Sequence, residues 1–251
     1  MNNIRFLYNT TIEKFLKSDI NSIIGIMANN FHGNLMTTTR ESWESEISIM
    51  KSTLDSVNFN KGQILFEYDI PRLGKRIDIV LLINGIIFCL EFKVGETVIH
   101  EEDIDQVLDY ALDLRNFHKL SQDKIIAPIL IPTNYKLKTQ DIKVSAYDDR
   151  IINPMMCGEN NLIEIINSIL AKYPYEKEID DNWGISPYSP TPTIIEAART
   201  LYNNHSVDNI TRHEADKVTT DKTINYILDV IRYSKENNKK SICFHTYAFL
   251  G

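Results

Sequence analysis

The sequence contains little cysteine and no long hydrophobic segment. Its three cysteines, Cys89, Cys157 and Cys243, lie far apart and never in the Cys-x-x-Cys spacing of a zinc site, so we expect thiols in a reducing compartment. The longest apolar run, 77–90, is interrupted by polar residues and is shorter than the roughly 20 apolar residues that cross a bilayer. The first residues lack the basic and apolar regions of a secretory signal. These absences predict a cytoplasmic protein without a membrane segment.

Positive charge is also in short supply. The 251 residues include 27 Lys and Arg against 34 Asp and Glu, a net charge of −7. A negative protein does not coat nucleic acid by bulk electrostatics, because phosphate contacts need basic side chains. Local contact with phosphate, or with a cation held by carboxylates, stays open. The composition, with 43% hydrophobic and 24% charged residues, is that of a globular protein and excludes a disordered chain or a collagen-like repeat.

Several motifs of known chemistry are missing. The sequence has neither Gly-x-Ser-x-Gly nor Gly-x-Gly-x-x-Gly. His100-Glu101 begins like a zinc-protease motif, but Ile104 occupies the place of the second histidine. His118 ends a predicted helix, where we expect a cap that interacts with the helix dipole. The sequence therefore lacks a nucleophile elbow, a dinucleotide loop and a zinc-protease site.

Proline is concentrated in one stretch of the chain. Residues 174–192 hold four of the eight prolines. Such a stretch favours extended backbone and ends helices, so it predicts a linker over 174–192. The linker separates an α/β domain, residues 1–173, from a short helical extension, residues 193–251, which is too small for a robust core of its own.

Hydrophobic periodicity predicts a mixed α/β arrangement in the first domain. The expected order is helix, three-strand antiparallel meander, helix, strand and helix, which indicates a mixed sheet covered by helices. The expected ranges are a helix at 40–57, strands at 64–70, 76–83 and 86–93, a helix at 101–117, a buried strand at 125–132 and a helix at 160–173. Beyond the linker we expect helices at 193–204 and 220–237 and a strand at 240–246.

The turn Asn84-Gly85 is a strong signal for a tight hairpin and fixes the register of its strands. It pairs Ile83 with Ile86, and the same register places Asp78 directly opposite Glu91. Directly opposed carboxylates have Cβ atoms roughly 5 Å apart and repel each other unless a cation lies between them. Mg²⁺ prefers oxygen ligands and needs one or two carboxylates together with substrate phosphate. The register therefore predicts a site for Mg²⁺ or Mn²⁺.

Two basic residues accompany these carboxylates. The register places Arg76 opposite Lys93, and strand alternation puts both on the face that carries the two acids and Val80. The other face is then entirely apolar, from Ile77 and Ile79 onward. The Lys93 ammonium would orient an attacking water or stabilise charge on a phosphate, which predicts metal-assisted hydrolysis of a phosphodiester. A solvated face whose basic residues neutralise its acids is the alternative.

Asp78, followed after a hairpin by Glu91-Phe92-Lys93, resembles the PD-(D/E)xK nuclease superfamily, whose core is a helix, three strands, a helix and a strand. The resemblance implies a restriction-endonuclease-like core and a Mg²⁺-dependent active site. In such a site Asp78 and Glu91 are metal ligands, and Lys93 is the catalytic cation. Ile77 stands where this family usually has proline.

Further candidates come from the same resemblance. Gln106 and Tyr110 resemble the Gln-x-x-x-Tyr motif of the RecB-like branch, which implies that they position the substrate; a polar flank of the helix is the alternative. The branch also has an acidic residue on its first helix that helps with metal or water, for which we favour Glu46 over Glu44. Glu67 is either an extra metal ligand or a surface residue of its strand.

Longer stretches, 67–78, 106–118 and 183–197, resemble the Schlafen group 3-like DNA/RNA helicase family of bacteria, in which a nuclease-like region precedes a P-loop helicase. In those relatives a strand like 240–246 leads into the phosphate loop, but this sequence has no Gly-x4-Gly-Lys-Ser/Thr. We therefore expect 193–251 to be the incomplete start of a helicase-like domain, without ATPase activity. A separate helicase or ATPase subunit is an expected partner, and defence against phage or mobile DNA follows by analogy.

The leading hypothesis is a metal-dependent nuclease that hydrolyses phosphodiester bonds of nucleic acid, with DNA as the expected substrate and RNA as the alternative. Because the net charge is negative, any contact with nucleic acid must be local, and Arg72, Lys75 and Arg76 are the nearest basic candidates. The alternative hypothesis is a catalytically inactive nucleic-acid-binding or docking subunit of a helicase–nuclease assembly.

Overall fold

The computed structural model describes residues 4–33, 35–56, 61–71, 73–136, 150–174 and 176–188, together with 229, 232, 233 and 236. The chain divides into two compact units, Met1–Ser189 and Pro190–Gly251, so the division falls inside the predicted linker. In the second unit the four described residues are helical and lie in the predicted helix 220–237. The other elements predicted there fall outside the described residues.

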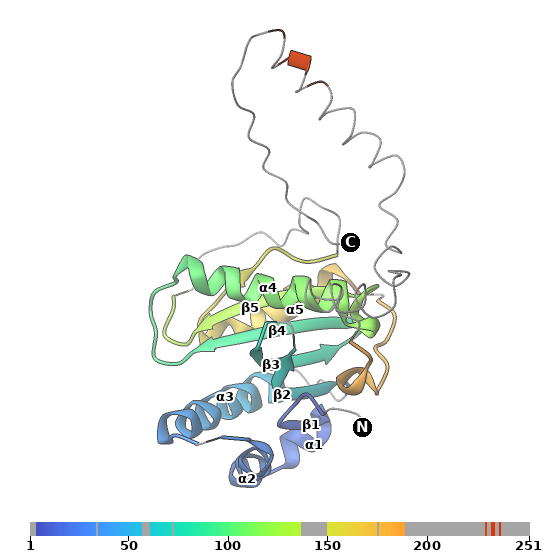
Figure 1. Ribbon diagram of the computed structural model, residues 1–251. Coiled ribbons are helices and arrows are strands. Elements are labelled where there is room, and N and C mark those ends of the chain that lie inside the picture. Colours follow the sequence, from blue (N-terminus) through green and yellow to red (C-terminus); the bar gives the residue numbers. More distant parts are fainter. Residues whose placement is uncertain are drawn as a thin grey trace, which may run out of the picture. The chain divides into compact units, whose positions relative to one another are not determined.

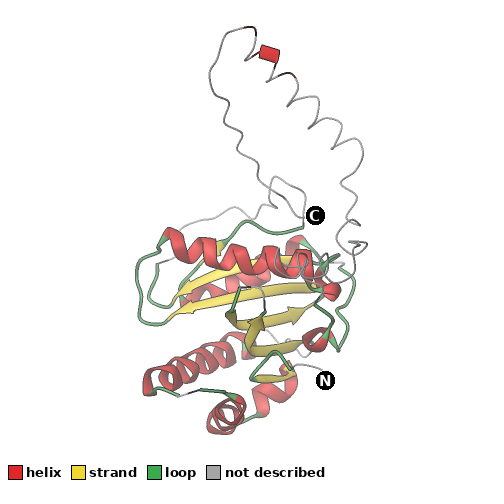
Figure 2. Cartoon of the chain, in the orientation of Figure 1, coloured by secondary structure: helices red, strands yellow, loops and turns green. Residues whose placement is uncertain are grey.

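A six-stranded mixed sheet with the order β1-β2-β3-β4-β5-β6 forms the centre of the first unit (Figures 1 and 2). Strands β1 to β4 are antiparallel neighbours, whereas β4, β5 and β6 are parallel. The predicted meander and the buried fourth strand are confirmed, and β1 and β6 extend the sheet at its two edges. The strands are β1 Tyr8–Thr11, β2 Gln63–Ile70, β3 Lys75–Ile83, β4 Ile86–Lys93, β5 Ile125–Pro132 and β6 Met155–Met156.

Helices cover both faces of this sheet, which confirms a mixed α/β fold. Helix α4 lies along one side and α1 to α3 lie on the other (Figure 1). Two hydrophobic clusters fill the layers: α1, α2, α3 and α5 pack on one face, and α4 packs on the other. Among the described residues no helix is both long and apolar enough to span a membrane. The helices are α1 Ile12–Lys17, α2 Ile20–Asn30, α3 Thr37–Asp55, α4 Glu101–Phe117 and α5 Leu162–Lys172, with 3-10 turns η1 Lys119–Ser121, η2 Glu159–Asn161 and η3 Trp183–Ile185.

The N-terminal elements, for which the sequence analysis made no prediction, begin at capping residues. The side chain of Thr11 accepts a hydrogen bond from the backbone of Lys14 at the start of α1, and that of Asp19 accepts one from Ser22 at the start of α2. Such bonds satisfy amide groups that a helix leaves unpaired at its first turn. Both helices bury apolar side chains against the sheet, so β1, α1 and α2 form one side of the core.

Residues 176–188 pack against the sheet on the side of α4. Trp183 is fully buried, and its Nε1 donates a hydrogen bond to Ser121 Oγ at 2.9 Å. The ring of His118 bonds to the same hydroxyl at 2.6 Å and to the carbonyl oxygen of Trp183 at 3.1 Å. The described part of the predicted linker 174–192 therefore belongs to the first unit by its contacts.

His118 is the C-cap residue of α4, but its ring is fully buried, and burial lowers its pKa from 6.5 to about 3. The neutral native ring therefore stabilises the fold above pH 6.5, and this contribution is lost as the pH falls from 6.5 towards 3. Between about pH 7.5 and 5 we expect the free energy of unfolding in urea to fall by about 2 kcal/mol on this account. His118→Gln should remove that part of the pH dependence. Equal slopes in the two proteins would contradict the burial argument.

Candidate functional site

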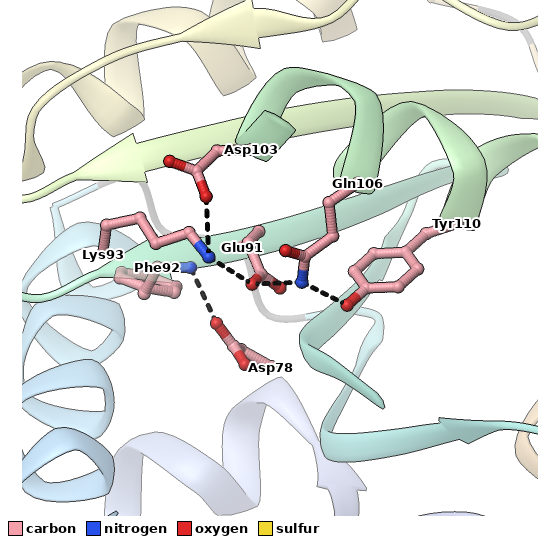
Figure 3. Close-up of polar contacts among 7 residues, drawn as sticks. All are labelled: Asp78, Glu91, Phe92, Lys93, Asp103, Gln106 and Tyr110. Atoms are coloured by element: carbon pink, nitrogen blue, oxygen red, sulfur yellow. Dashed lines mark hydrogen bonds and ion pairs between the residues drawn. The ribbon is translucent and has the colours of Figure 1, made fainter. Parts of the chain in front are cut away.

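The ladder between β3 and β4 ends beside the predicted site. Its register is the predicted one as far as the pair Ile79↔Leu90. Past that pair β3 stays hydrogen-bonded to β2, while β4 continues along β5. Asp78 lies where the strands part, and its Oδ2 accepts a hydrogen bond from the backbone N–H of Phe92 at 2.8 Å (Figure 3). Asp78 and Glu91 are therefore neighbours across an opening instead of a ladder pair.

A break in β2 and β3 changes which side chains share a face. Glu67 has a φ of 53°, in the left-handed region, while the β2–β3 pairs on both sides of it keep one register. Ile79 packs in the cluster with α3, whereas Ile77 packs in the cluster with α4. The prediction of one entirely apolar face is therefore wrong at Ile77, because strict alternation assumes a strand that is extended throughout.

The predicted position of Arg76 opposite the end of β4 is also wrong. Its Nη1 lies 3.6 Å from Glu67 Oε2, and its guanidinium lies 5.5 Å from the centroid of the Phe31 ring, on the side of α2 and α3. Lys75 is exposed, and Arg72 lies outside the described residues. A contact of these three basic residues with nucleic acid stays a prediction.

The side chain of Glu91 faces α4 and is the centre of a polar network (Figure 3). Its Oε1 accepts hydrogen bonds from Lys93 Nζ at 3.1 Å and from Gln106 Nε2 at 2.7 Å. Lys93 Nζ also lies 3.1 Å from Asp103 Oδ1, and Gln106 Nε2 donates to the Tyr110 hydroxyl at 2.6 Å. The fold thus brings four of the predicted site residues into one set of contacts.

Asp103 is a member of this network that the sequence analysis missed. It lies in the first turn of α4, three residues before Gln106 and seven before Tyr110, so helical spacing places all three on one face. Burial lowers the pKa of Lys93, but Glu91 and Asp103 outweigh it and hold that pKa above the usual 10.5. Lys93 is therefore a fixed cation at neutral pH.

Glu46 on α3 reaches the same region, and the alternative, Glu44, is exposed. Glu46 is 5% exposed, and its Oε2 has no hydrogen-bond partner among the described residues. Burial raises the pKa of Glu46 well above its usual 4.5, and the carboxylates of Asp78, Glu67 and Glu91 raise it further. The helix thus presents a buried acid, Glu46, to the cavity that Asp78 and Glu91 also line, and the role of Glu46 with metal or water stays a prediction.

The carboxyl groups of Asp78 on β3 and Glu91 on β4 also have raised pKa values. Burial, and then the charge of Glu91, raise the pKa of Asp78 well above 3.8, against the hydrogen bond from Phe92. Burial also raises the pKa of Glu91, against the Lys93 ammonium. Glu91 Oε2 is a second buried carboxylate oxygen without a partner in the described residues. The nearby basic side chains therefore do not balance the negative charge of these carboxylates. An added cation would reduce the repulsion among them.

The carboxylates of Glu46, Asp78 and Glu91 line one cavity of about 300 Å³. Cavities of about 400 Å³ beside the Asn84-Gly85 turn and about 440 Å³ beside Thr133 hold none of them. The chemistry therefore favours the smaller cavity as the functional one. Its lining residues are Thr38, Thr39, Ser42, Trp43, Glu46, Glu67, Asp78, Glu91, Phe92 and Val94.

The donor atoms around this cavity suit a hard divalent cation. Glu46, Asp78 and Glu91 supply carboxylate oxygens, and two of these oxygens are buried and have no partner among the residues that the structure describes. Within the described part of the chain, no three His, Cys, Asp or Glu side chains converge closely enough to form a complete set of ligands. Mg²⁺ keeps several of its waters and needs few protein ligands, so this donor set fits Mg²⁺ or Mn²⁺.

Comparisons of the chain with protein-family models, with curated proteins and with solved structures gave no match.

Proposed function

We propose that this chain is a metal-dependent nuclease that hydrolyses phosphodiester bonds, with DNA as its preferred substrate. The observation that carries the proposal is the fixed ammonium of Lys93, which lies between Asp103 and Glu91, and Glu91 lines the cavity together with Asp78. An acidic cavity whose carboxylate Glu91 is paired with a lysine ammonium suits a reaction in which an anionic phosphate and a metal ion meet.

Each residue has a role in this proposal. Asp78 and Glu91 would hold Mg²⁺ or Mn²⁺, and Glu46 would help with the metal or with its water. The ion, when bound, polarises the phosphodiester and lowers the pKa of a water molecule. The Lys93 ammonium orients the attacking water and stabilises negative charge on the phosphate. Gln106 donates to Oε1 of Glu91, so the cation would bind at Oε2, which has no partner in the described part of the chain.

Tyr110 completes this arrangement from the next turn of α4. Its hydroxyl accepts the second hydrogen bond of the Gln106 amide, which fixes the direction of that amide towards Glu91. Side chains that hold a ligand in one orientation keep the geometry of the site ready for substrate, and their loss commonly weakens metal binding or activity on the order of tenfold to 100-fold. The Gln106–Tyr110 pair therefore supports the site from one rigid helix.

The test is cleavage of labelled single-stranded and double-stranded DNA and RNA by the full chain with Mg²⁺ or Mn²⁺, compared with EDTA. We expect metal-dependent cleavage, and we expect Lys93→Met to reduce its rate on the order of 100-fold to 1,000-fold, because the ammonium acts on developing charge. Lys17→Met is the matched control, since Lys17 is an exposed residue of α1 whose ion pair is with Glu13.

Three outcomes would contradict the nuclease proposal. Cleavage that persists in EDTA would remove the metal from the mechanism. An unchanged rate in Lys93→Met would remove the proposed cation. Binding of nucleic acid by the wild-type chain without any cleavage would favour the alternative, a non-cleaving binding or docking subunit.

A further inference from the structure

We propose that Glu67 is a positioning residue of this site, which strengthens cation binding by its charge while Trp43 and Arg76 hold it away from direct coordination. The inference rests on the proposed metal-dependent function and adds to it a residue on β2. Three observations carry it: the backbone conformation of Glu67, the partners of its two oxygens, and its place in the wall of the cavity.

The backbone of Glu67 is in an uncommon conformation for its residue type. Its φ of 53° lies in the left-handed region, in the interior of a strand. Residues other than glycine adopt this region rarely, and strained residues persist where their surroundings over-determine them, often at functional sites. Asn84, with a φ of 49°, belongs to a tight hairpin turn that requires such a conformation. Glu67 lies within strand β2, so a turn does not explain its left-handed conformation.

Both carboxylate oxygens of Glu67 have partners. Trp43 Nε1 donates a hydrogen bond to Oε1 at 2.8 Å, and Arg76 Nη1 lies 3.6 Å from Oε2. Trp43 is 1% exposed, so its N–H has little access to water in place of this bond. Glu46 and Glu91, in contrast, each leave one buried oxygen without a partner in the described residues. Glu67 is therefore the carboxylate of the cavity that is least free to become a ligand.

The charge of Glu67 nevertheless acts on the cavity that it lines. Its carboxylate lines the same cavity as the carboxylates of Glu46, Asp78 and Glu91. In the absence of a cation this charge repels the three acids, and in the presence of a divalent cation the same charge attracts it. Glu67 therefore destabilises the empty site and stabilises the cation-bound one.

The experiment compares Glu67→Gln with the wild-type full chain. The glutamine keeps an amide oxygen for Trp43 and removes the charge. We expect the Kd for Mn²⁺ alone, measured by calorimetry, to rise on the order of tenfold, as for other residues that support metal ligands. Thermal unfolding of the metal-free variant should occur at the wild-type temperature or above it. Glu44→Gln on α3 is the matched control, because Glu44 is exposed.

A second variant, Glu67→Gly, suits the left-handed backbone and also removes the charge, so it should show the same loss of Mn²⁺ affinity. Wild-type Mn²⁺ affinity in either variant would overturn the inference. Markedly earlier unfolding of Glu67→Gln would also overturn it, since that result indicates a purely structural role. Failure of the proposed function is distinguishable: the wild-type chain would then bind no Mn²⁺, and the metal would change neither its stability nor its cleavage of nucleic acid.

Discussion

Replacing Asp78 by asparagine should abolish metal-dependent cleavage and at the same time make the metal-free protein more stable. The variant removes a predicted metal ligand, so we expect the cleavage rate to fall on the order of 1,000-fold. It keeps a side-chain oxygen that can accept the hydrogen bond from Phe92, so the strand opening is retained. It also removes one charge from a crowded set of carboxylates, which should raise the free energy of unfolding by about 1 kcal/mol.

The pH dependence of this gain has a definite sign. The pKa of Asp78 is raised above 3.8 in the native state, so the native protein holds a proton that the unfolded chain releases. The stability contribution is therefore complete below pH 3.8 and is lost as the pH rises through the native value. In urea unfolding, the advantage of Asp78→Asn should therefore grow as the pH rises through the native pKa and shrink as the pH falls towards 3.8.

Asp55→Asn, an exposed change at the end of α3, is the control for both measurements and should alter neither. Cleavage by Asp78→Asn at the wild-type rate would refute the catalytic assignment. A less stable Asp78→Asn protein would refute the repulsion among the carboxylates, whatever its activity.

Trp183→Ala should lower the free energy of unfolding by about 3–5 kcal/mol, the range for the loss of a fully buried aromatic side chain. The Trp183 ring centroid lies 5.0 Å from that of Tyr68 and 4.5 Å from that of His118, so the substitution leaves a cavity between α4 and the sheet. It also leaves the Ser121 hydroxyl without its indole donor. Urea unfolding followed by circular dichroism measures the change.

Trp183→Phe separates the two parts of this effect. Phenylalanine keeps most of the ring and loses the indole N–H, so we expect a smaller loss of about 1–2 kcal/mol. A loss below about 1 kcal/mol in Trp183→Ala would mean that residues 176–188 add little to the core. Trp183→Phe should keep the wild-type affinity for Mn²⁺, because Trp183 is not among the residues that line the cavity of the carboxylates.

The regular helices and strands were predicted well from the sequence, because each shows one repeat of apolar residues, about 3.6 residues in a helix and two in a strand. The expected ranges 101–117 and 125–132 coincide with α4 and β5, and the hairpin register is the observed one up to Ile79↔Leu90. In the site, the two-residue spacing placed Glu91 and Lys93 on one face of a strand, and the four-residue spacing placed Gln106 and Tyr110 on one face of a helix. In the structure the two pairs are in contact. These contacts need only a regular strand and a regular helix that pack on each other.

The parts that could not be predicted depend on contacts between distant segments. The left-handed backbone at Glu67 breaks the alternation of β2 and β3, and its side-chain partners come from α3 and β3. Glutamate has no local preference for that conformation. The sequence therefore could not show that Ile77 packs on the opposite face of the sheet or that Arg76 pairs with Glu67. Trp183 is similar, since its partners His118 and Ser121 precede it by more than 60 residues.

Helix α4 is held near both of its ends. Asp103, in its first turn, contacts Lys93, and His118, its C-cap residue, bonds to Ser121 and to Trp183. A helix of 17 residues is about 25 Å long, and ends without such contacts fray readily. Because both ends are held, fraying of α4 is opposed, and the helix keeps Gln106 and Tyr110, the side chains that position Glu91, in place.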